Sequence, residues 1–346
     1  MIPARRSAAC LPGLFAIFLS GCATTQQSSI DPAGGQAARI AGLMEFFFIL
    51  LSVIFVTVIV TTLWTLRRRH RGIEQEPLER THRPSEATEH GLRNATLAAM
   101  VVTVVILFGL LIASVSTGAA TLNYHDQPSA VSIELTGNQW WWQARYASQD
   151  PTRILVTANE IHIPVGRPVM ITGSSHDVIH SFWIPNLQGK MDLIPSRVNS
   201  QVLEADHPGR YRGQCAEFCG LQHAHMALWI IAESQDDFNK WMEAQLQPAP
   251  APSDADELRG QQVFLNTSCV LCHSIRGTTA SGRTGPDLTH LASRSTIAAG
   301  TLPNTKGDLG GWISDPQRIK PGNHMATVPV SATDLQPLLD YLESLK

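Results

Sequence analysis

Four soft metal ligands stand close together in the run CAEFCGLQHAHM of this 346-residue chain. Cys215 and Cys219 supply two thiolates, His223 supplies an imidazole and Met226 supplies a thioether. Ligands of this softness select copper. A mononuclear electron-transfer copper needs one Cys, two His and a weak axial Met, so this run holds one thiolate more than a single copper requires. The sequence therefore favours two copper ions bridged by both thiolates.

Two copper ions need further donors. His180, in the upstream run HSFWIP, can supply a second imidazole, which with His223 gives one imidazole to each metal. Met226 would be a weak axial donor to one copper, and the backbone carbonyl of Glu217 could serve the other. Spreading one electron over two metals keeps the reorganisation small, which suits electron transfer.

Other interpretations of the same residues stay open. A tetrahedral zinc could be held by one further ligand together with Cys215, Cys219 and His223. A disulfide within either close pair of cysteines would suit an exported protein, although His and Met follow each pair at ligand positions. Further histidines make the assignment of the ligands less specific, because His176 and His225 lie beside the candidate ligands. Structural roles are the better explanation for His162 and His225.

A second motif follows at Cys269-Val-Leu-Cys272-His273, which is the attachment signature of a c-type haem. Cys269 and Cys272 would form thioethers with the haem vinyl groups, and His273 would be an axial iron ligand. Met325 is the only methionine after the motif and is the candidate sixth ligand, with His324 as the alternative. A His/Met pair raises the haem potential, which suits a high-potential electron relay. The chain is thus expected to carry two redox centres.

The N-terminus has the pattern of an export signal. Arg5 and Arg6 precede the apolar run LFAIFL, and small residues lead to Cys22. This pattern predicts a signal peptide over residues 1–21. The sequence Leu-Ser-Gly-Cys resembles a bacterial lipobox, so Cys22 is expected to become the lipid-bearing first residue of the mature chain, with ordinary cleavage as the alternative.

Two apolar runs, about 40–66 and 95–115, are each long enough to cross a hydrocarbon core of about 30 Å as a helix. They predict a transmembrane hairpin within residues 22–121. Four arginines lie between the runs at positions 67–71, and such a cluster marks the cytoplasmic side. The rest of the chain is therefore expected on the outer, periplasmic face of a bacterial inner membrane.

The outer part divides at a Pro/Ala tract that cannot pack a core and predicts a semi-rigid linker over residues 247–256. Residues 122–246 hold short runs of branched residues bounded by Gly, Pro and Asn, which predict an all-β sandwich or barrel. Residues 257–346 open and close with amphipathic stretches around the haem motif, the layout of a small helical cytochrome. The net charge of −3 is uninformative, and the chain has no nucleotide-binding glycine loop. No nucleic-acid partner is expected.

With these parts in view, the chain resembles subunit II of haem-copper cytochrome c oxidases, in the caa3-type variant with a fused C-terminal cytochrome c domain. The motifs that carry the resemblance occur in the family's order: GNQWWW at 137–142, DVIHSFWIP, KMDLIPSR and CAEFCGLQHAHM. The resemblance implies a two-helix hairpin, a cupredoxin-like β-barrel and an all-α class I cytochrome c domain. It also implies that a binuclear copper A centre is held by His180, Cys215, Glu217, Cys219, His223 and Met226.

The resemblance assigns further roles. Trp140 matches the family's residue at which electrons arrive from cytochrome c, whereas the residues alone predict a strand with alternate rings in the core and at a partner interface. An electron port of this kind needs an exposed ring. Glu217 matches a residue whose side chain helps to bind magnesium at the interface with subunit I, and Asp192 faces the same region by analogy. The sequence around Met325 lacks the Pro that commonly follows the ligand Met.

Glu89 is a candidate for the proton-channel glutamate at the start of the second helix. The local run TEHGLRNAT lacks the Trp of the family motif, and a carboxylate at a membrane edge is more often simply solvated.

The function that follows is electron delivery within an oxygen-reducing, proton-translocating cytochrome c oxidase. A cytochrome c, or a quinol–cytochrome c reductase complex, would reduce the covalent haem c. Electrons would pass to the copper pair and on to the oxygen-reducing site of subunit I, with subunit III as a further partner. The chain lacks the intramembrane histidine cluster that oxygen reduction requires.

Three alternatives belong to other classes of protein. A copper-delivery module would favour a labile mononuclear site, against the second Cys. A quinol oxidase subunit typically lacks the two copper-binding cysteines. Nitrous oxide reductase shares the copper motif but needs a second copper-cluster domain that this chain cannot hold.

Overall fold

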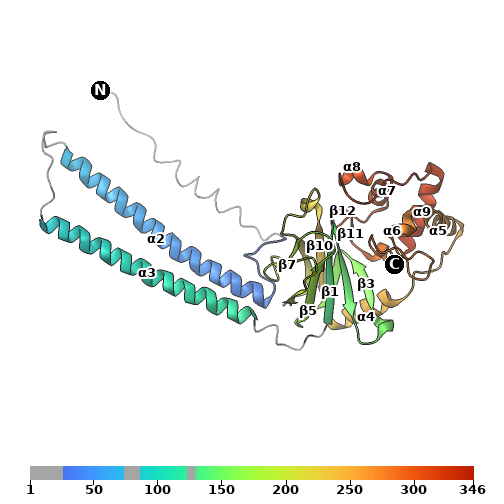
Figure 1. Ribbon diagram of the computed structural model, residues 1–346, viewed down its shortest axis with the longest axis horizontal. Coiled ribbons are helices and arrows are strands. Elements are labelled where there is room, and N and C mark those ends of the chain that lie inside the picture. The colour runs from blue at the N-terminus through green and yellow to red at the C-terminus, as the bar shows by residue number, and fades with distance from the viewer. Residues whose placement is uncertain (1–25, 74–85, 123–128, 130) are drawn as a thin grey trace, which may run out of the picture. The chain divides into compact units, whose positions relative to one another are not determined.

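The computed structural model describes residues 26–73, 86–122, 129 and 131–346. The predicted signal peptide and Cys22 lie outside the described residues. The chain divides into two compact units, of which one is Ala38–Gln127 and the other combines the residues up to Ala37 with Pro128–Lys346. Two apolar helices, a β-sheet domain and a helical domain follow one another along the chain, in the order that the sequence predicts (Figure 1).

The first unit is a pair of long helices, α2 (Gly35–Ile73) and α3 (Glu86–Leu122). Both are long and apolar enough to cross a membrane, and the side chains of their apolar stretches are not buried by protein. They extend beyond the apolar runs 40–66 and 95–115, because helical backbone continues into the polar residues that flank each run. Arg68 lies over the ring of Trp64, 4.0 Å from its centroid, as expected where a helix leaves the hydrocarbon for the headgroups.

The β domain, residues 131–246, is a sandwich of two five-stranded sheets with strand orders β3-β2-β1-β5-β8 and β4-β10-β9-β6-β7 (Figure 1). Alternate residues of β5 (Val169–Ser175) are buried, as the period of two predicts for strands with one face in a core. The helix α4 (Gln235–Leu246) closes the domain. The other strands are β1 (Val131–Asn138), β2 (Trp141–Ala147), β3 (Leu155–Ala158), β4 (Glu160–Pro164), β6 (His180–Trp183), β7 (Met191–Leu193), β8 (Asn199–Leu203), β9 (Gly209–Cys215) and β10 (Ala227–Glu233).

Strand pairing gathers the candidate ligands at one end of the second sheet. β6 begins at His180 and runs antiparallel to β9, which ends at Cys215. The chain then forms a loop over residues 215–226, here called the thiolate loop, and returns as β10 beside β9. His180 is thereby placed next to a loop that lies 35 residues further along the chain.

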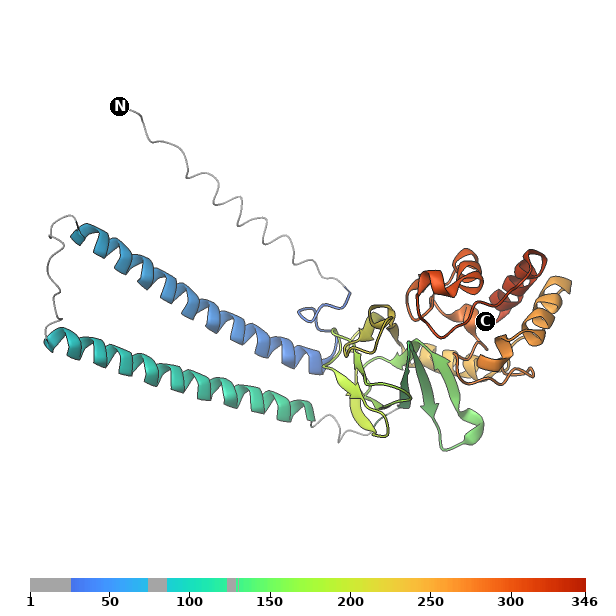
Figure 2. The same cartoon turned by 45° about the horizontal axis from the view of Figure 1, so that its top comes forward.

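The helical domain, residues 255–346, is built on α5 (Ala255–Asn266) and α9 (Ala332–Ser344), which lie side by side (Figure 2). Asp254 and Ser331 cap these helices through their side-chain oxygens. The helices approach closely at Gly260, where an added Cβ would lie 1.9 Å from the carbonyl oxygen of Pro337. The remaining elements are α6 (Cys269–Cys272), η4 (Leu291–Ser293), β11 (Thr296–Ile297), β12 (Leu302–Pro303), α7 (Lys306–Ser314) and α8 (Pro316–Ile319).

The Pro/Ala tract between the two domains is not a free spacer. The backbone N–H of Ala249 donates to the carbonyl of Arg276 at 2.9 Å, and the Arg276 guanidinium donates back to the carbonyl of Leu246 at 3.0 Å. A ring nitrogen of His290 lies 3.1 Å from the carbonyl oxygen of Gln247. The sequence predicted a spacer because the tract cannot form a core of its own, but polar groups of the helical domain hold its backbone.

Candidate functional site

The two thiols of the thiolate loop lie in contact but do not form a disulfide. Cys215 and Cys219 are each 2% exposed, and their Sγ atoms are 3.8 Å apart. A disulfide requires about 2.05 Å between the sulfurs. Two thiolates that share a tetrahedral metal at about 2.3 Å each are separated by a distance close to the one observed. The spacing therefore suits metal binding and rules out a disulfide in this structure.

The other four predicted donors surround this pair. His180 Nδ1 lies 3.8 Å from Cys215 Sγ, and His223 Nδ1 lies 3.6 Å from Cys219 Sγ. The Glu217 carbonyl oxygen is 3.2 Å from Cys215 Sγ, and the Met226 Sδ is 3.9 Å from Cys219 Sγ. Each sulfur thus has its own imidazole and its own weak donor. A single tetrahedral zinc would not need this two-fold arrangement.

A carboxylate that the sequence analysis missed orients one of the imidazoles. His180 Nε2 lies 2.8 Å from Asp177 Oδ1, and the Gln139 backbone N–H donates to Asp177 Oδ2 at 2.6 Å. Although burial raises the pKa of Asp177, the hydrogen bonds from His180 and Gln139 outweigh it and lower that pKa. The ionised carboxylate keeps the proton of His180 on Nε2 and leaves Nδ1 free to bind a metal. The available signal was the Asp three residues before His180.

The two thiols share one proton. A hydrogen bond from Cys219 lowers the pKa of Cys215 to about 3, and the same bond, with burial, raises the pKa of Cys219. Cys215 is therefore a thiolate at neutral pH, which is the form that binds metals.

The helical domain prepares His273 as a ligand in a comparable way. A hydrogen bond of 2.8 Å joins its Nδ1 to the carbonyl oxygen of Pro286, so Nδ1 carries the proton and Nε2 is free. Burial lowers the pKa of His273, which keeps the ring neutral. Gly285 lies against the ring, where an added Cβ would come within 2.8 Å of the His273 Cε1. Only a glycine leaves the ring this position.

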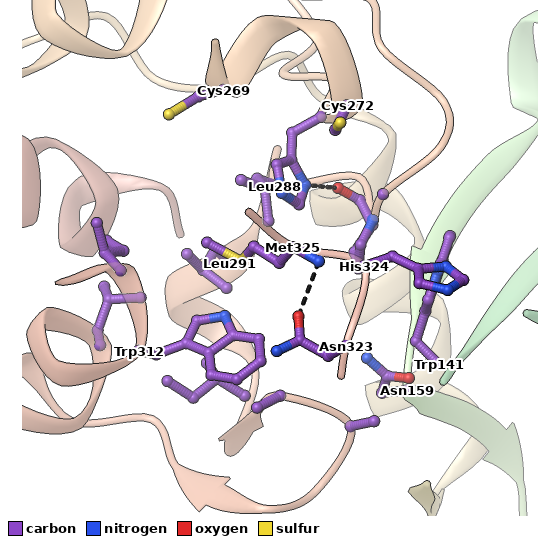
Figure 3. A pocket seen from close by; sticks show the side chains of 18 of the residues that line it. Trp141, Asn159, Cys269, Cys272, Leu288, Leu291, Trp312, Asn323, His324 and Met325 are labelled. Carbon is purple, nitrogen blue, oxygen red and sulfur yellow. Dashed lines mark hydrogen bonds between the residues drawn. The ribbon is translucent and has the colours of Figure 1, made fainter. Parts of the chain in front are cut away.

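A cavity opens beside His273, and we call it the helical-domain cavity. Figure 3 shows the thiols of Cys269 and Cys272 at its edge and the side chain of Met325 pointing into it. The ring of His324 points away, toward the β domain (Figure 3). Met325 is therefore better placed than His324 to bind a group held in this cavity. Apolar side chains form much of the remaining wall, including Leu288, Leu291, Trp312, Ile313 and Leu342.

The expectation of an exposed ring at Trp140 is wrong. This ring is only 7% exposed, because the helical domain of the same chain covers it: the centroid of the His324 ring lies 5.3 Å from that of Trp140. Trp140 Nε1 donates to the carbonyl oxygen of Cys219 at 2.9 Å, which ties the ring to the thiolate loop. Trp142 belongs to the core, and Trp141 borders the helical-domain cavity.

The side chains of the three predicted carboxylates are not buried. Glu89 is exposed in the first turn of α3, Asp192 is exposed in β7, and the Glu217 side chain is exposed in the thiolate loop. Among the described residues, the group of His, Cys, Asp and Glu side chains close enough to share a metal is His180 with Cys215 and Cys219.

Two further histidines that the sequence analysis named, His162 and His225, have structural partners. The His225 Nδ1 lies 2.8 Å from the Gln222 side-chain oxygen. The ring of His162 stacks on Trp241, with 4.1 Å between centroids, and its Nδ1 lies 2.9 Å from a carboxylate oxygen of Glu233. Burial alone would lower the pKa of His162, but hydrogen bonds with Glu160 and Glu233 outweigh burial and raise it.

This raised pKa predicts that the β domain loses stability as the pH rises above about 6.5 and through the higher folded-state pKa of His162. In the unfolded chain the His162 pKa is about 6.5, so the stabilisation is complete below that pH and is lost as the pH passes the higher folded value. Thermal unfolding midpoints of the purified chain and of a His162→Gln variant check this. We expect a weaker pH dependence in the variant, and equal dependence in both proteins would contradict the assignment.

Comparisons with known proteins agree with this geometry. Residues 147–234 match the family described as cytochrome c oxidase subunit II, periplasmic domain, and residues 258–346 match the cytochrome c family. The chain is 34% identical to cytochrome c oxidase subunit 2 of Alkalihalophilus pseudofirmus, over 95% of this chain and 94% of that protein. It is 30% identical to the subunit 2 of Bacillus sp. strain PS3, over 96% of each protein.

A similar solved structure is the periplasmic domain of subunit II of the cytochrome oxidase of Bradyrhizobium japonicum. It is 28% identical, covers 34% of this chain and 95% of its own, and has a TM-score of 0.32. The sequence matches and the order of the elements confirm the predicted fold class: two apolar helices, a cupredoxin-like β domain and a helical cytochrome c domain. The chain belongs to the cytochrome c oxidase subunit II family, in the form that carries a cytochrome c domain at its C-terminal end.

Proposed function

We propose that this chain carries electrons from a cytochrome c to subunit I of its oxidase, through a covalent haem c and a binuclear copper A centre. The observation that carries the proposal is the pairing of Cys215 with His180 and of Cys219 with His223 around one sulfur–sulfur contact. When bound, the haem and the copper pair would supply the one-electron redox couples. The chain's own residues hold these groups, orient them and keep water away.

The thiolate loop and His180 together fit two copper ions through the six predicted donors. Cys215, Cys219, His180 and His223 would hold the two metals. Met226 and the Glu217 carbonyl would be the weak donors. Full burial of His180 and Met226 excludes water from this side of the centre, and the Asp177 carboxylate fixes the His180 ring.

The helical domain fits a c-type haem. Cys269 and Cys272 would attach it, and His273, with its free Nε2, would bind the iron on one side. Met325 points into the same cavity and would also hold the iron (Figure 3). The contact between His324 and Trp140 then lies between the two redox sites, which supports Trp140 as the residue through which electrons reach the copper pair.

The remaining parts suit a subunit of a membrane complex. We assign residues 1–21 to a lipoprotein-type signal, 22–121 to a two-pass hairpin, 122–246 to the copper domain, 247–256 to the linker and 257–346 to the cytochrome. The hairpin would place both redox domains on the periplasmic face, with Cys22 as a possible lipid anchor. Subunits I and III would be the partners, and oxygen reduction would be coupled to proton translocation. The exposed Glu217 side chain would bind magnesium at the subunit I interface, and Glu89 would serve a proton channel.

The first test is the metal and haem content of the purified full chain, combined with copper EPR. We expect two coppers and one haem per chain, and the hyperfine pattern of one electron shared by two coppers. One copper per chain, or zinc in its place, would contradict the proposal.

The carboxylate of Asp177 gives a further prediction. We expect Asp177→Ala to weaken copper binding about 10- to 100-fold, the range found when a partner of a metal-binding His is removed. Competition with a copper chelator measures the affinity. Asp192→Ala, which removes an exposed carboxylate from the neighbouring strand β7, is the matched control and should bind copper as the wild type does.

A further inference from the structure

Lys320 of the helical domain is buried against the β domain. Lys320 comes directly after α8 in the chain, and it is 3% exposed. The Nζ atom donates to the carbonyl oxygens of His225 at 2.8 Å, Ala298 at 3.1 Å and Trp140 at 3.2 Å. Two of these three acceptors belong to the β domain. The contact therefore joins the two domains.

A buried lysine bonded only to carbonyl groups is unusual, because lysine is almost never fully buried without a charged partner. An ammonium has three N–H donors, and the three carbonyl oxygens match them in number. A neutral amine would turn its lone pair toward one of these oxygens. Burial lowers the pKa of Lys320 to about 7, so the three hydrogen bonds oppose a cost of desolvation. The geometry favours the ammonium form. We call the three carbonyl oxygens that accept its hydrogen bonds the cradle.

The residues after Lys320 extend the same contact onto the thiolate loop. The Gln222 side-chain amide donates to the Pro321 carbonyl at 2.6 Å. Gly322 has a φ of +80° and lies so close to the Leu221 side chain that an added Cβ would come within 2.6 Å of it. The turn that carries Lys320 is thus fitted to the loop that holds Cys215 and Cys219.

The cradle lies beside the contact between the two redox sites. Lys320 binds the backbone of Trp140, whose ring packs on His324 and whose Nε1 donates to the Cys219 carbonyl. His324 precedes Met325, which points into the helical-domain cavity (Figure 3). Trp140 and Lys320 both line that cavity. A shift of the helical domain would separate the His324 ring from the Trp140 ring.

We propose that Lys320 is a positioning residue for electron transfer between the haem domain and the copper domain. Its ammonium holds the helical domain on the Trp140 backbone and the thiolate loop, and so keeps the ring of His324 against that of Trp140. The inference rests on the function proposed above. It adds a residue whose ammonium donates to backbone carbonyl oxygens of both domains.

The test uses the full chain, loaded with copper and haem. Lys320→Met removes all three donors, and Lys320→Gln keeps two without the charge. Lys240→Met removes an exposed lysine of α4 and is the control. Copper content, haem content, both redox potentials and the copper EPR signal are measured first. The rate of electron transfer from the haem to the copper is then measured after rapid photoreduction of the haem.

We expect all variants to load both groups with unchanged spectra. The transfer rate should fall at least about tenfold in Lys320→Met, less in Lys320→Gln and not at all in Lys240→Met, because removing a buried hydrogen-bonded charge weakens a docked interface severely. A wild-type rate in either loaded Lys320 variant overturns the inference while the proposed function stands. A wild-type chain that binds no copper pair, or that transfers no electron, overturns the proposed function instead.

Discussion

Cys219→Ser is expected to abolish the copper centre and, with it, oxidase turnover with cytochrome c. Cys219 Sγ contacts three other donors, namely the Cys215 sulfur, the His223 ring and the Met226 sulfur. A serine hydroxyl is harder and far less acidic than a thiol, so it cannot take the place of a bridging thiolate. Removing a partner of a metal ligand costs about 10- to 100-fold in affinity, and removing a bridging ligand should cost more.

Copper analysis and steady-state turnover of the assembled oxidase measure this effect, and the haem content serves as the internal control. The variant should still carry one haem, because Cys269, Cys272 and His273 belong to the other domain. Normal copper content with normal turnover would show that the thiolate loop does not hold the copper pair.

Met325→Leu should have the second largest effect. We expect the haem to stay attached, because Cys269 and Cys272 are unchanged, and its reduction potential to fall by roughly 100 mV or more as the Met ligand is lost. Reduction of the haem by its donor should slow accordingly. Redox titration of the haem absorbance gives the potential.

His324→Leu is the matched variant for this experiment, because His324 is the alternative ligand. The His324 ring points toward the β domain and packs on Trp140, so its loss should leave the haem potential close to that of the wild type (Figure 3). The opposite pattern, with a fall in potential only in His324→Leu, would assign the sixth position to His324.

The sequence predicted most of the cluster of candidate copper donors because its members are close in sequence. Five of the six donors lie between Cys215 and Met226, and a loop that short must bring them together. His180 is distant in sequence, and its placement depends on the pairing of β6 with β9, which no local pattern encodes. Asp177 was missed because an aspartate before a histidine has no distinctive spacing. Its role emerges only from the hydrogen bond to His180 Nε2.

The contact between the domains could not be predicted from the sequence. Trp140 was expected to be exposed because nothing in the tryptophan run indicates that the following domain covers it. Its burial depends on contacts with Lys320 and His324, which lie 180 or more residues further along the chain. Lys320 stands in the ordinary polar run PQRIKPG, where nothing distinguishes it from a surface lysine. Likewise, the linker tract gave no sign that Arg276 holds its backbone.

The covered ring of Trp140 has a consequence for how the enzyme is supplied. In the proposed function, a free cytochrome c cannot reach this ring while the helical domain lies on it, so added donors cannot bypass the fused haem. Electrons must pass through the haem before they reach the copper pair. The slower of the two transfers therefore limits the overall rate. Saturating the solution with a better external donor would then raise turnover only up to the rate of the internal step.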